Sequence, residues 1–200
     1  MIYEALIGPD FHKLHPKLKE RYEIGLGDVF EATGVMEVMR SGPTLMKPVY
    51  YAMTLNDFLI PESGTDIPFT LKYWVERFDG RFAEVIWERV FYFPEVTRTF
   101  TTNMKIDTLQ QTGADYLGSP AVFSSNVQFD VTKDGLLLMR SLDQHIVLGT
   151  LEIPVPQQLA GRGVVIEGYD EEREAYTIEV SFTNSAGPLV MYKGTFQSKK

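Results

Sequence analysis

The sequence predicts a mainly β protein, an antiparallel barrel or half-barrel of about nine or ten strands with short helices near its N-terminus. Two observations predict this fold. Short segments that alternate apolar and polar residues recur from residue 33 to residue 196, which is the pattern of strands that bury one face. Turn sequences such as Asp79-Gly80 and Lys133-Asp134-Gly135 separate these segments, where a parallel sheet would need helices. Successive strands are therefore expected to run antiparallel.

A single domain is expected over residues 1–200, with a helical segment at 1–24 and the sheet at 33–196, because no change in composition marks a second domain. The formal net charge of −8 argues against capture of nucleic acid or of an anionic lipid surface. The sequence has no cysteine, which excludes disulfides, thiolate metal sites and cysteine nucleophiles.

The N-terminus gives an expectation about location. Its first residues, Met1-Ile2-Tyr3-Glu4, lack the basic and apolar regions of a signal peptide. No run of the sequence approaches the roughly 18 apolar residues of a membrane span. We therefore expect a cytoplasmic bacterial protein without a membrane span.

The N-terminal segment is expected to form two helices. Residues 2–7 carry apolar side chains at helical spacing and end at a Gly-Pro pair. In the second helix Leu14, Leu18 and Tyr22 recur every four residues, and Pro16 stands where a first helical turn tolerates proline. These helices are expected to plug or cover one end of the barrel.

Two further segments precede the central hairpin. Residues 33–40 alternate like a strand and end at Ser41-Gly42-Pro43. Residues 47–58 begin with Lys47-Pro48, which favours a helix, while their β-branched and aromatic content leaves a strand open.

The hairpin at residues 68–94 is the best-defined element. Asp79-Gly80 is a strong hairpin signal. With Gly80 in the left-handed conformation of a bulged turn, Arg77 would lie opposite Arg81 and odd-numbered residues would pair with odd. A two-residue loop would put acidic residues among the apolar ones, so the side-chain pattern favours the bulged turn. The predicted inner face comprises Phe69, Leu71, Tyr73, Val75, Ala83, Val85, Trp87, Phe91 and Phe93.

The rest of the chain predicts more strands of the same kind. They are expected near residues 97–106, 121–131, 136–142, 145–153, 164–169, 176–182 and 189–196. Thr112-Gly113 and Gly118-Ser119-Pro120 indicate a loop between the first two of these.

Short motifs along nearly the whole chain resemble a bacterial domain family of unknown function. They include Tyr3-Glu4-Ala5-Leu6-Ile7-Gly8, Leu14-His15-Pro16, Gly34-Val35-Met36-Glu37-Val38, Asp66-Ile67-Pro68-Phe69, Trp87-Glu88-Arg89, Phe100-Thr101-Thr102, Pro154-Val155-Pro156, Leu159-Ala160 and Gly187-Pro188-Leu189-Val190. The family occurs alone or fused behind saccharopine-dehydrogenase-like nucleotide-binding domains. The resemblance thus implies domain boundaries and a reductase-like partner domain, and in a chain that stands alone a homodimer is the nearer substitute. It implies no chemistry.

Three arginines fall among apolar residues in the expected strands. Arg89 shares a face with Trp87 and Phe91, Arg98 with Phe100 and Met104, and Arg140 with Leu136 and Leu138. Arginines inside a barrel would hold the anionic head of an amphiphile above a cavity that Tyr73 also lines. The alternative is that each arginine reaches solvent at a strand end or pairs with Glu37, Glu152 or Glu167.

Histidines offer the other candidate chemistry. His145 shares parity with Val147 and would be a base or ligand inside the cavity, or a hydrogen-bonded core residue. His12 and His15 are three residues apart, but Pro16 follows and no zinc-protease pattern is completed, so no metal site is expected. The glycine pairs of the chain lack the strand-to-helix context of a phosphate loop, and no cofactor is expected.

The residues therefore leave three functions open. The first is a non-catalytic barrel that binds a small apolar or amphiphilic anion through Arg89, Trp87, Tyr73, Phe91, Arg98, Phe100, Arg140 and His145. The second is an enzyme that acts on such a ligand with His145 or Glu167 as base. The third is an interaction or accessory module, for which Trp74, Phe82 and Ile86 on the outer face of the hairpin would form the contact surface.

Overall fold

The structure is a computed structural model that describes residues 1–157, 160–185 and 187–199. Leu159, one of the residues that carry the family resemblance, lies outside the described residues. The helical segments are Ile2–Ile7 (α1), Gly8–Lys13 (η1), Pro16–Tyr22 (α2), Thr44–Met46 (η2), Lys47–Met53 (α3) and Thr54–Asn56 (η3). The strands are Val29–Ser41 (β1), Gly64–Phe78 (β2), Phe82–Tyr92 (β3), Thr97–Asp107 (β4), Thr112–Gly118 (β5), Ala121–Val131 (β6), Leu137–Leu148 (β7), Leu151–Pro154 (β8), Arg162–Asp170 (β9), Ala175–Asn184 (β10) and Gly187–Ser198 (β11).

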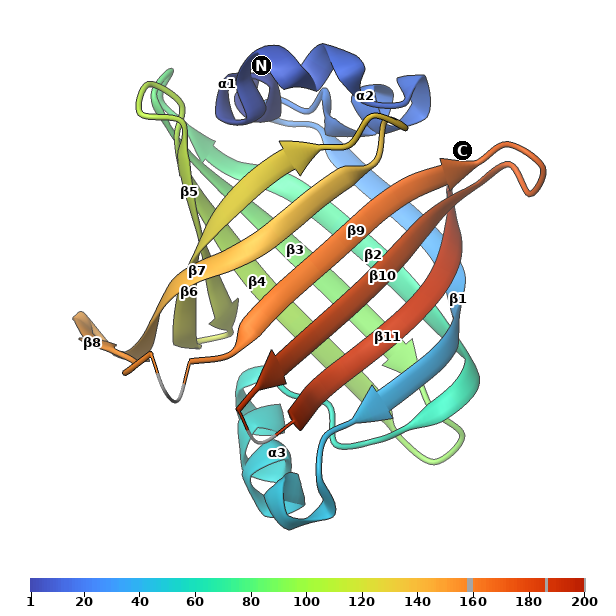
Figure 1. Cartoon of the computed structure of the whole chain (residues 1–200), viewed down its shortest axis with the longest axis vertical. Coiled ribbons are helices and arrows are strands. Elements are labelled where there is room, and N and C mark those ends of the chain that lie inside the picture. The colour runs from blue at the N-terminus through green and yellow to red at the C-terminus, as the bar shows by residue number, and fades with distance from the viewer. Residues whose placement is uncertain (158–159, 186, 200) are drawn as a thin grey trace.

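The predicted fold class is confirmed, because the strands form a closed antiparallel barrel of ten strands with one extra strand (Figure 1). Each strand from β1 to β6 pairs with the next, and β11, β10, β9 and β7 continue the sheet from the other side of β1. The pairing of β6 with β7 closes the ring. The extra strand, β8, pairs with the end of β7 and extends away from the barrel. Closure leaves the ten strands of the ring without a free edge.

Helical segments lie at both ends of the barrel. The N-terminal helices α1 and α2 lie over one end, as predicted, and α3 lies near the opposite end (Figure 1). Tyr3, Leu6, Leu18 and Tyr22 from the N-terminal helices belong to the same buried core as the strands. Residues 47–53 are helical and not extended, with Pro48 in the first turn of α3. The core thus continues from inside the barrel into the helices that cover one end.

The faces of the central hairpin agree with the prediction, but its register differs. All nine residues of the predicted inner face are buried. Odd residues pair with odd from Phe69 to Val75, as in Tyr73 with Trp87, but not beyond the bulge, where Phe78 lies opposite Ala83. The predicted pairing of Arg77 with Arg81 is wrong, because Arg77 lies opposite Glu84. The loop is longer than predicted, because residues 79–82 separate the last pair, Phe78 and Ala83. A bulge between Val75 and Arg77 adds one residue to β2 and restores the pairing of odd with odd residues. Gly80 has the predicted positive φ, at 95°.

The predicted loop at residues 112–120 is wrong over most of its length, because Thr112–Gly118 forms strand β5. The glycines that indicated the loop lie at its ends. Gly113 packs beneath Leu6, since a Cβ at this glycine would lie 3.5 Å from the leucine side chain. Gly118 has a φ of 101°, which favours glycine, and it ends the strand. The missed strand carries an aspartate into the barrel interior.

Candidate functional site

A cavity of about 90 Å³ lies inside the barrel. Apolar residues supply most of its wall, namely Trp87, Phe100, Met104, Leu117, Val127, Phe129, Met139, Val165, Ile178, Val180 and Phe182. Tyr3, Tyr22 and Tyr192 also contribute. The polar residues of the wall are Arg89, Thr102, Asp115, Ser125, Arg140, Ser141 and Glu167. Mostly apolar walls with a few polar groups are typical of small-molecule sites.

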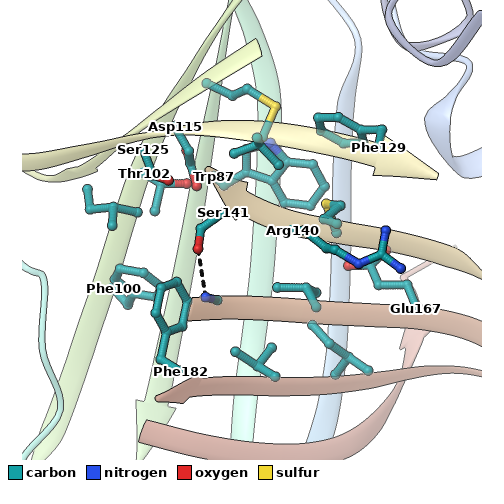
Figure 2. Close-up of a pocket in the computed structure, with 18 of the residues that line it drawn as sticks. Trp87, Phe100, Thr102, Asp115, Ser125, Phe129, Arg140, Ser141, Glu167 and Phe182 are labelled. Atoms are coloured by element: carbon teal, nitrogen blue, oxygen red, sulfur yellow. Dashed lines mark hydrogen bonds between the residues drawn. The ribbon is translucent and has the colours of Figure 1, made fainter. Parts of the chain in front are cut away.

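Three of these polar residues lie on three neighbouring strands. Thr102 comes from β4, Asp115 from β5 and Ser125 from β6, and Asp115 pairs directly with Ser125 across the sheet. Side chains on a strand alternate between its faces, so Asp115 points inward with Gly113 and Leu117. Figure 2 shows the side chains of Thr102, Asp115 and Ser125 gathered on one wall of the cavity. The barrel geometry thus creates a small polar patch in an apolar cavity.

Asp115 has an unusual electrostatic environment. Burial raises the pKa of its carboxyl group to about 6, while the positive charge of Arg89 and the nearby hydroxyl group of Thr102 act in the opposite direction. The guanidinium carbon of Arg89 lies 5.5 Å from the ring centre of Trp87 and 5.2 Å from that of Phe100. Arg89 forms no ion pair with any carboxylate of the described residues. Near neutral pH the patch therefore combines one cation with a carboxyl group that is easily protonated.

Three buried polar atoms on this cavity lack a hydrogen-bond partner within the described part of the chain. They are Nη1 of Arg89, Oγ1 of Thr102 and Oδ1 of Asp115. A buried donor or acceptor without a partner costs roughly 1–3 kcal/mol, and more when it is charged. Such groups are rare in folded proteins and call for an explanation. Here a guanidinium donor, a hydroxyl group and a carboxyl group meet at one site.

A second polar cluster lies under the N-terminal helices. Arg21 of α2 donates to Glu167 of β9, with 2.6 Å between Nη1 and Oε2 and 3.4 Å between Nη2 and Oε1. The hydroxyl group of Tyr22 donates to the same Oε2 over 2.6 Å. Both charged side chains are almost completely buried, at 0% and 3% exposure. The ion pair joins α2 to the barrel, and the positive charge of Arg21 compensates the negative charge of Glu167.

Aromatic rings surround the guanidinium of Arg21. Its carbon lies 4.8 to 5.6 Å from the ring centres of Tyr22, Phe30, Tyr73, Trp87, Tyr176 and Phe196. Burial opposes the charge on Arg21, but the carboxylate of Glu167 and the hydroxyl groups of Tyr22 and Tyr73 together outweigh it and hold the arginine pKa above its ordinary value. Burial also raises the pKa of the Tyr22 hydroxyl, which therefore stays protonated as a donor. This cluster has the character of a structural anchor.

The structure places the sequence-predicted aromatic residues in two groups. Trp87 and Phe100 line the cavity together with Arg89. Tyr73 stacks on Trp87 with 4.0 Å between ring centres, and its hydroxyl donates to the backbone oxygen of Arg21 over 2.5 Å. Phe91 is buried against Phe69. Tyr73 and Phe91 therefore support the core around the cavity instead of lining it.

The two other predicted arginines are held in ion pairs. Arg98 donates twice to Glu62, over 2.9 and 2.6 Å, and lies outside the cavity lining. The prediction that Arg140 faces inward with Leu136 and Leu138 is wrong, because Leu137, at 0% exposure, and the cavity-lining Met139 occupy that face of β7. Arg140 borders the cavity in Figure 2, but its side chain is 46% exposed and pairs with Asp130.

The histidines and Glu167 do not form a catalytic arrangement. His145 lies on β7 opposite Ser124 and Pro154 and does not line the cavity. The carboxylate of Glu167 reaches the cavity, but Arg21 and Tyr22 already donate to it. His15 accepts from the backbone nitrogen of Lys17 and lies 3.0 Å from Glu171.

No cluster of three or more His, Asp or Glu side chains suited to a metal ion occurs within residues 1–157, 160–185 and 187–199. Over the same residues no helix is both long enough and apolar enough to cross a membrane.

Sequence reasoning missed Asp115, Ser125 and Arg21. Asp115 fell in the expected loop, although Gly113, Asp115 and Leu117 share the period of two that marks one face of a strand. Ser125 precedes a bulge between Ser125 and Val127, which changes the alternation of β6. No local pattern marks Arg21 for burial, since its partner Glu167 is 146 residues away.

Two comparisons place the chain among known proteins. A family model described as a domain of unknown function, DUF4166, matches residues 14–196. The uncharacterized protein YndH of Bacillus subtilis (strain 168) is 32% identical over 200 residues, which is 100% of this chain and 97% of that protein. Neither match bears on the fusion to nucleotide-binding domains, which stays a prediction.

Proposed function

This chain belongs to the DUF4166 family of domains of unknown function, and we propose that its barrel binds a small amphiphilic molecule in the cavity beside Arg89. The polar head group of the ligand would contact Arg89, Thr102 and Asp115. Its apolar part would lie against side chains such as Phe100 and Phe182. The proposed role is binding and not catalysis.

One observation carries this proposal. Three buried polar atoms without a hydrogen-bond partner among the described residues belong to a single cavity wall. A ligand with both an acceptor and a donor would satisfy Arg89 Nη1 and Asp115 Oδ1 together. Each bond would recover part of the penalty that the unpartnered group carries. The wall therefore favours a ligand with a polar head over a purely apolar one.

The size of the cavity limits the ligand. An engineered apolar cavity of about 150 Å³ binds benzene, and this cavity measures about 90 Å³. We therefore expect a ligand of about six non-hydrogen atoms or fewer. Ligands of that size gain at most about 1.5 kcal/mol per atom, so a dissociation constant between about 1 µM and 1 mM is expected.

The other two functions have less support. An enzyme with His145 or Glu167 as base would need one of these groups free inside the cavity, whereas His145 lies outside the lining and Glu167 is paired. An accessory module would present an exposed aromatic surface, and Phe82 on the outer face is 45% exposed. That module would not need unpartnered polar groups inside the barrel, which a binding protein explains.

A fragment titration tests the proposal. Protein labelled with ¹⁵N would be titrated with acids, amides and alcohols of about six or fewer non-hydrogen atoms. We expect saturable amide shifts centred on Thr102, Asp115 and Ser125, and their loss in Arg89→Gln with the remaining spectrum preserved. Arg173→Gln is the matched control, because it removes an exposed guanidinium that does not line the cavity. Binding that persists in Arg89→Gln, or no saturable shifts with any fragment, would contradict the proposal.

A further inference from the structure

We propose that the ligand is a short-chain monocarboxylic acid, and that it binds together with one proton that its carboxyl group shares with Asp115. This inference rests on the proposed function and names the ligand class and its linkage to pH. No covalent bond forms or breaks. The proton is taken from solvent when the ligand enters and is returned when the ligand leaves.

The missing partner of Arg89 points to an acid. The guanidinium lies among the aromatic rings of Trp87 and Phe100 and forms no ion pair with any described carboxylate. An arginine that is removed from water is stabilised by an anion that accepts its hydrogen bonds, and a carboxylate matches its geometry. Nη1, which has no partner among the described residues, is the donor that such a ligand would use. A ligand carboxylate would supply the counter-ion that the fold does not.

The charges of the cavity then require a proton. The charge of Glu167 is already matched by Arg21, and that of Arg140 by Asp130, so Arg89 and Asp115 are the remaining charged groups of the cavity wall. An added carboxylate would leave two negative charges beside a single positive one. Two carboxylates that share a buried site cannot both stay ionised, so one of them takes up a proton.

Asp115 is suited to hold or share that proton. Its buried Oδ1 has no partner among the described residues, and burial has already raised the pKa of the carboxyl group to about 6. The other titratable groups that act on Asp115 are Arg89 from β3, Tyr3 from α1 and Tyr192 from β11. Burial raises the pKa of both tyrosines, so they remain neutral. Arg89 is thus the cation that faces Asp115 within the described residues.

The test compares butyrate with butyramide, a neutral probe of the same size and shape. Affinities for the wild-type protein and for Asp115→Asn would be measured by NMR titration from about pH 6 to pH 8. If binding takes up one proton, the wild-type affinity for butyrate falls about tenfold for each pH unit above about 6. In Asp115→Asn the affinity for butyrate is expected to be independent of pH over this range, and at pH 8 about a hundred times that of the wild type.

A matched control and a second readout separate the outcomes. Asp130→Asn removes a carboxylate from the outer surface and is expected to retain the wild-type pH dependence. Calorimetry in two buffers with different enthalpies of ionisation would count the protons directly, with about one expected near pH 7.5. If butyrate binds with a pH-independent affinity, or if butyramide binds as tightly, the inference is overturned while the binding function stands. If no probe shifts the cavity resonances, the proposed function fails as well.

Discussion

Nη1 of Arg21 lies 2.6 Å from Oε2 of Glu167, and this pair joins helix α2 to strand β9 across 146 residues of sequence. Both side chains are buried. Removing one member of a buried pair leaves the other charge without compensation and typically costs about 3–5 kcal/mol. The pair is therefore one of the buried contacts that attach α2 to the barrel, beside the hydrogen bonds from Tyr22 to Glu167 and from Tyr73 to the backbone oxygen of Arg21.

We predict that Arg21→Met lowers the free energy of unfolding by about 3–5 kcal/mol, because the buried side chain of Glu167 would lose the guanidinium that compensates it. Urea unfolding followed by tryptophan fluorescence would measure the loss. Adding Glu167→Gln should restore part of it, since that change removes the uncompensated charge. Arg140→Met removes an exposed arginine and should cost about 0–1 kcal/mol. Equal losses in Arg21→Met and Arg140→Met would contradict the prediction.

The close approach of β1 to β11 gives a second stability prediction. Gly34 lies opposite Phe196, and a Cβ at position 34 would stand 2.1 Å from the backbone oxygen of Thr195. Gly34→Ala should therefore destabilise the protein by about 3 kcal/mol, because a strand backbone would have to move. Gly161→Ala is the control, since its nearest neighbour would be 3.5 Å away. Denaturant midpoints that are lowered equally in the two variants would show that the contact at Gly34 is unimportant.

The alternation of side chains predicted which face of each hairpin strand is buried, but not the register. Tyr73 and Trp87 are both buried, as their parity indicated, because a strand with one buried face must repeat every two residues. The longer loop at residues 79–82 shifts the pairing, and the bulge near Glu76 restores the pairing of odd with odd residues, so the predicted face stays buried. A bulge adds one residue to a strand, and the apolar and polar residues can still alternate on both sides of it. The position of the bulge could therefore not be predicted from the sequence.

A residue of the candidate site could be predicted from the sequence only where its neighbours on the same strand showed which face is buried. Arg89 stood out because its own strand made it an inward cation between aromatic residues. Asp115 was not predicted, because the turn-forming glycines on both sides of it indicated a loop where strand β5 lies. Glu167 was recognised as a partner for an inward arginine, but the arginine that pairs with it is Arg21. That pairing depends on how the N-terminal helices sit on the barrel, which local sequence does not determine.

A third prediction concerns stability and pH. The pKa of Asp115 is raised from 3.8 to about 6 in the folded state, so the native protein binds more protons than the unfolded chain between these values. Stability contributed by the protonated form is present below about pH 4 and is lost as the pH rises to about 6. Asp115→Asn should therefore be more stable than the wild type by about 3 kcal/mol at pH 7.

Urea unfolding at pH 7 and pH 4 would check this, because the difference between the two proteins should nearly vanish at the lower pH. Asp130→Asn is the control variant, because it removes a carboxylate from the outer surface of the barrel and not from the cavity. A wild type that is more stable than Asp115→Asn at pH 7 would mean that the ionised carboxylate is well compensated inside the barrel.

The last prediction tests the electrostatic contact between Arg89 and Asp115 without any ligand. The charge of Arg89 favours the ionised form of Asp115 and partly offsets the effect of burial. Arg89→Gln should therefore raise the pKa of Asp115 above about 6, as measured by NMR titration of its side-chain carboxyl carbon. Arg173→Gln, which alters an exposed arginine that does not line the cavity, should leave that titration in place. If the Arg89 variant also titrates near pH 6, the two groups are not coupled, and Asp115 would have no electrostatic means of sensing an anion bound at Arg89.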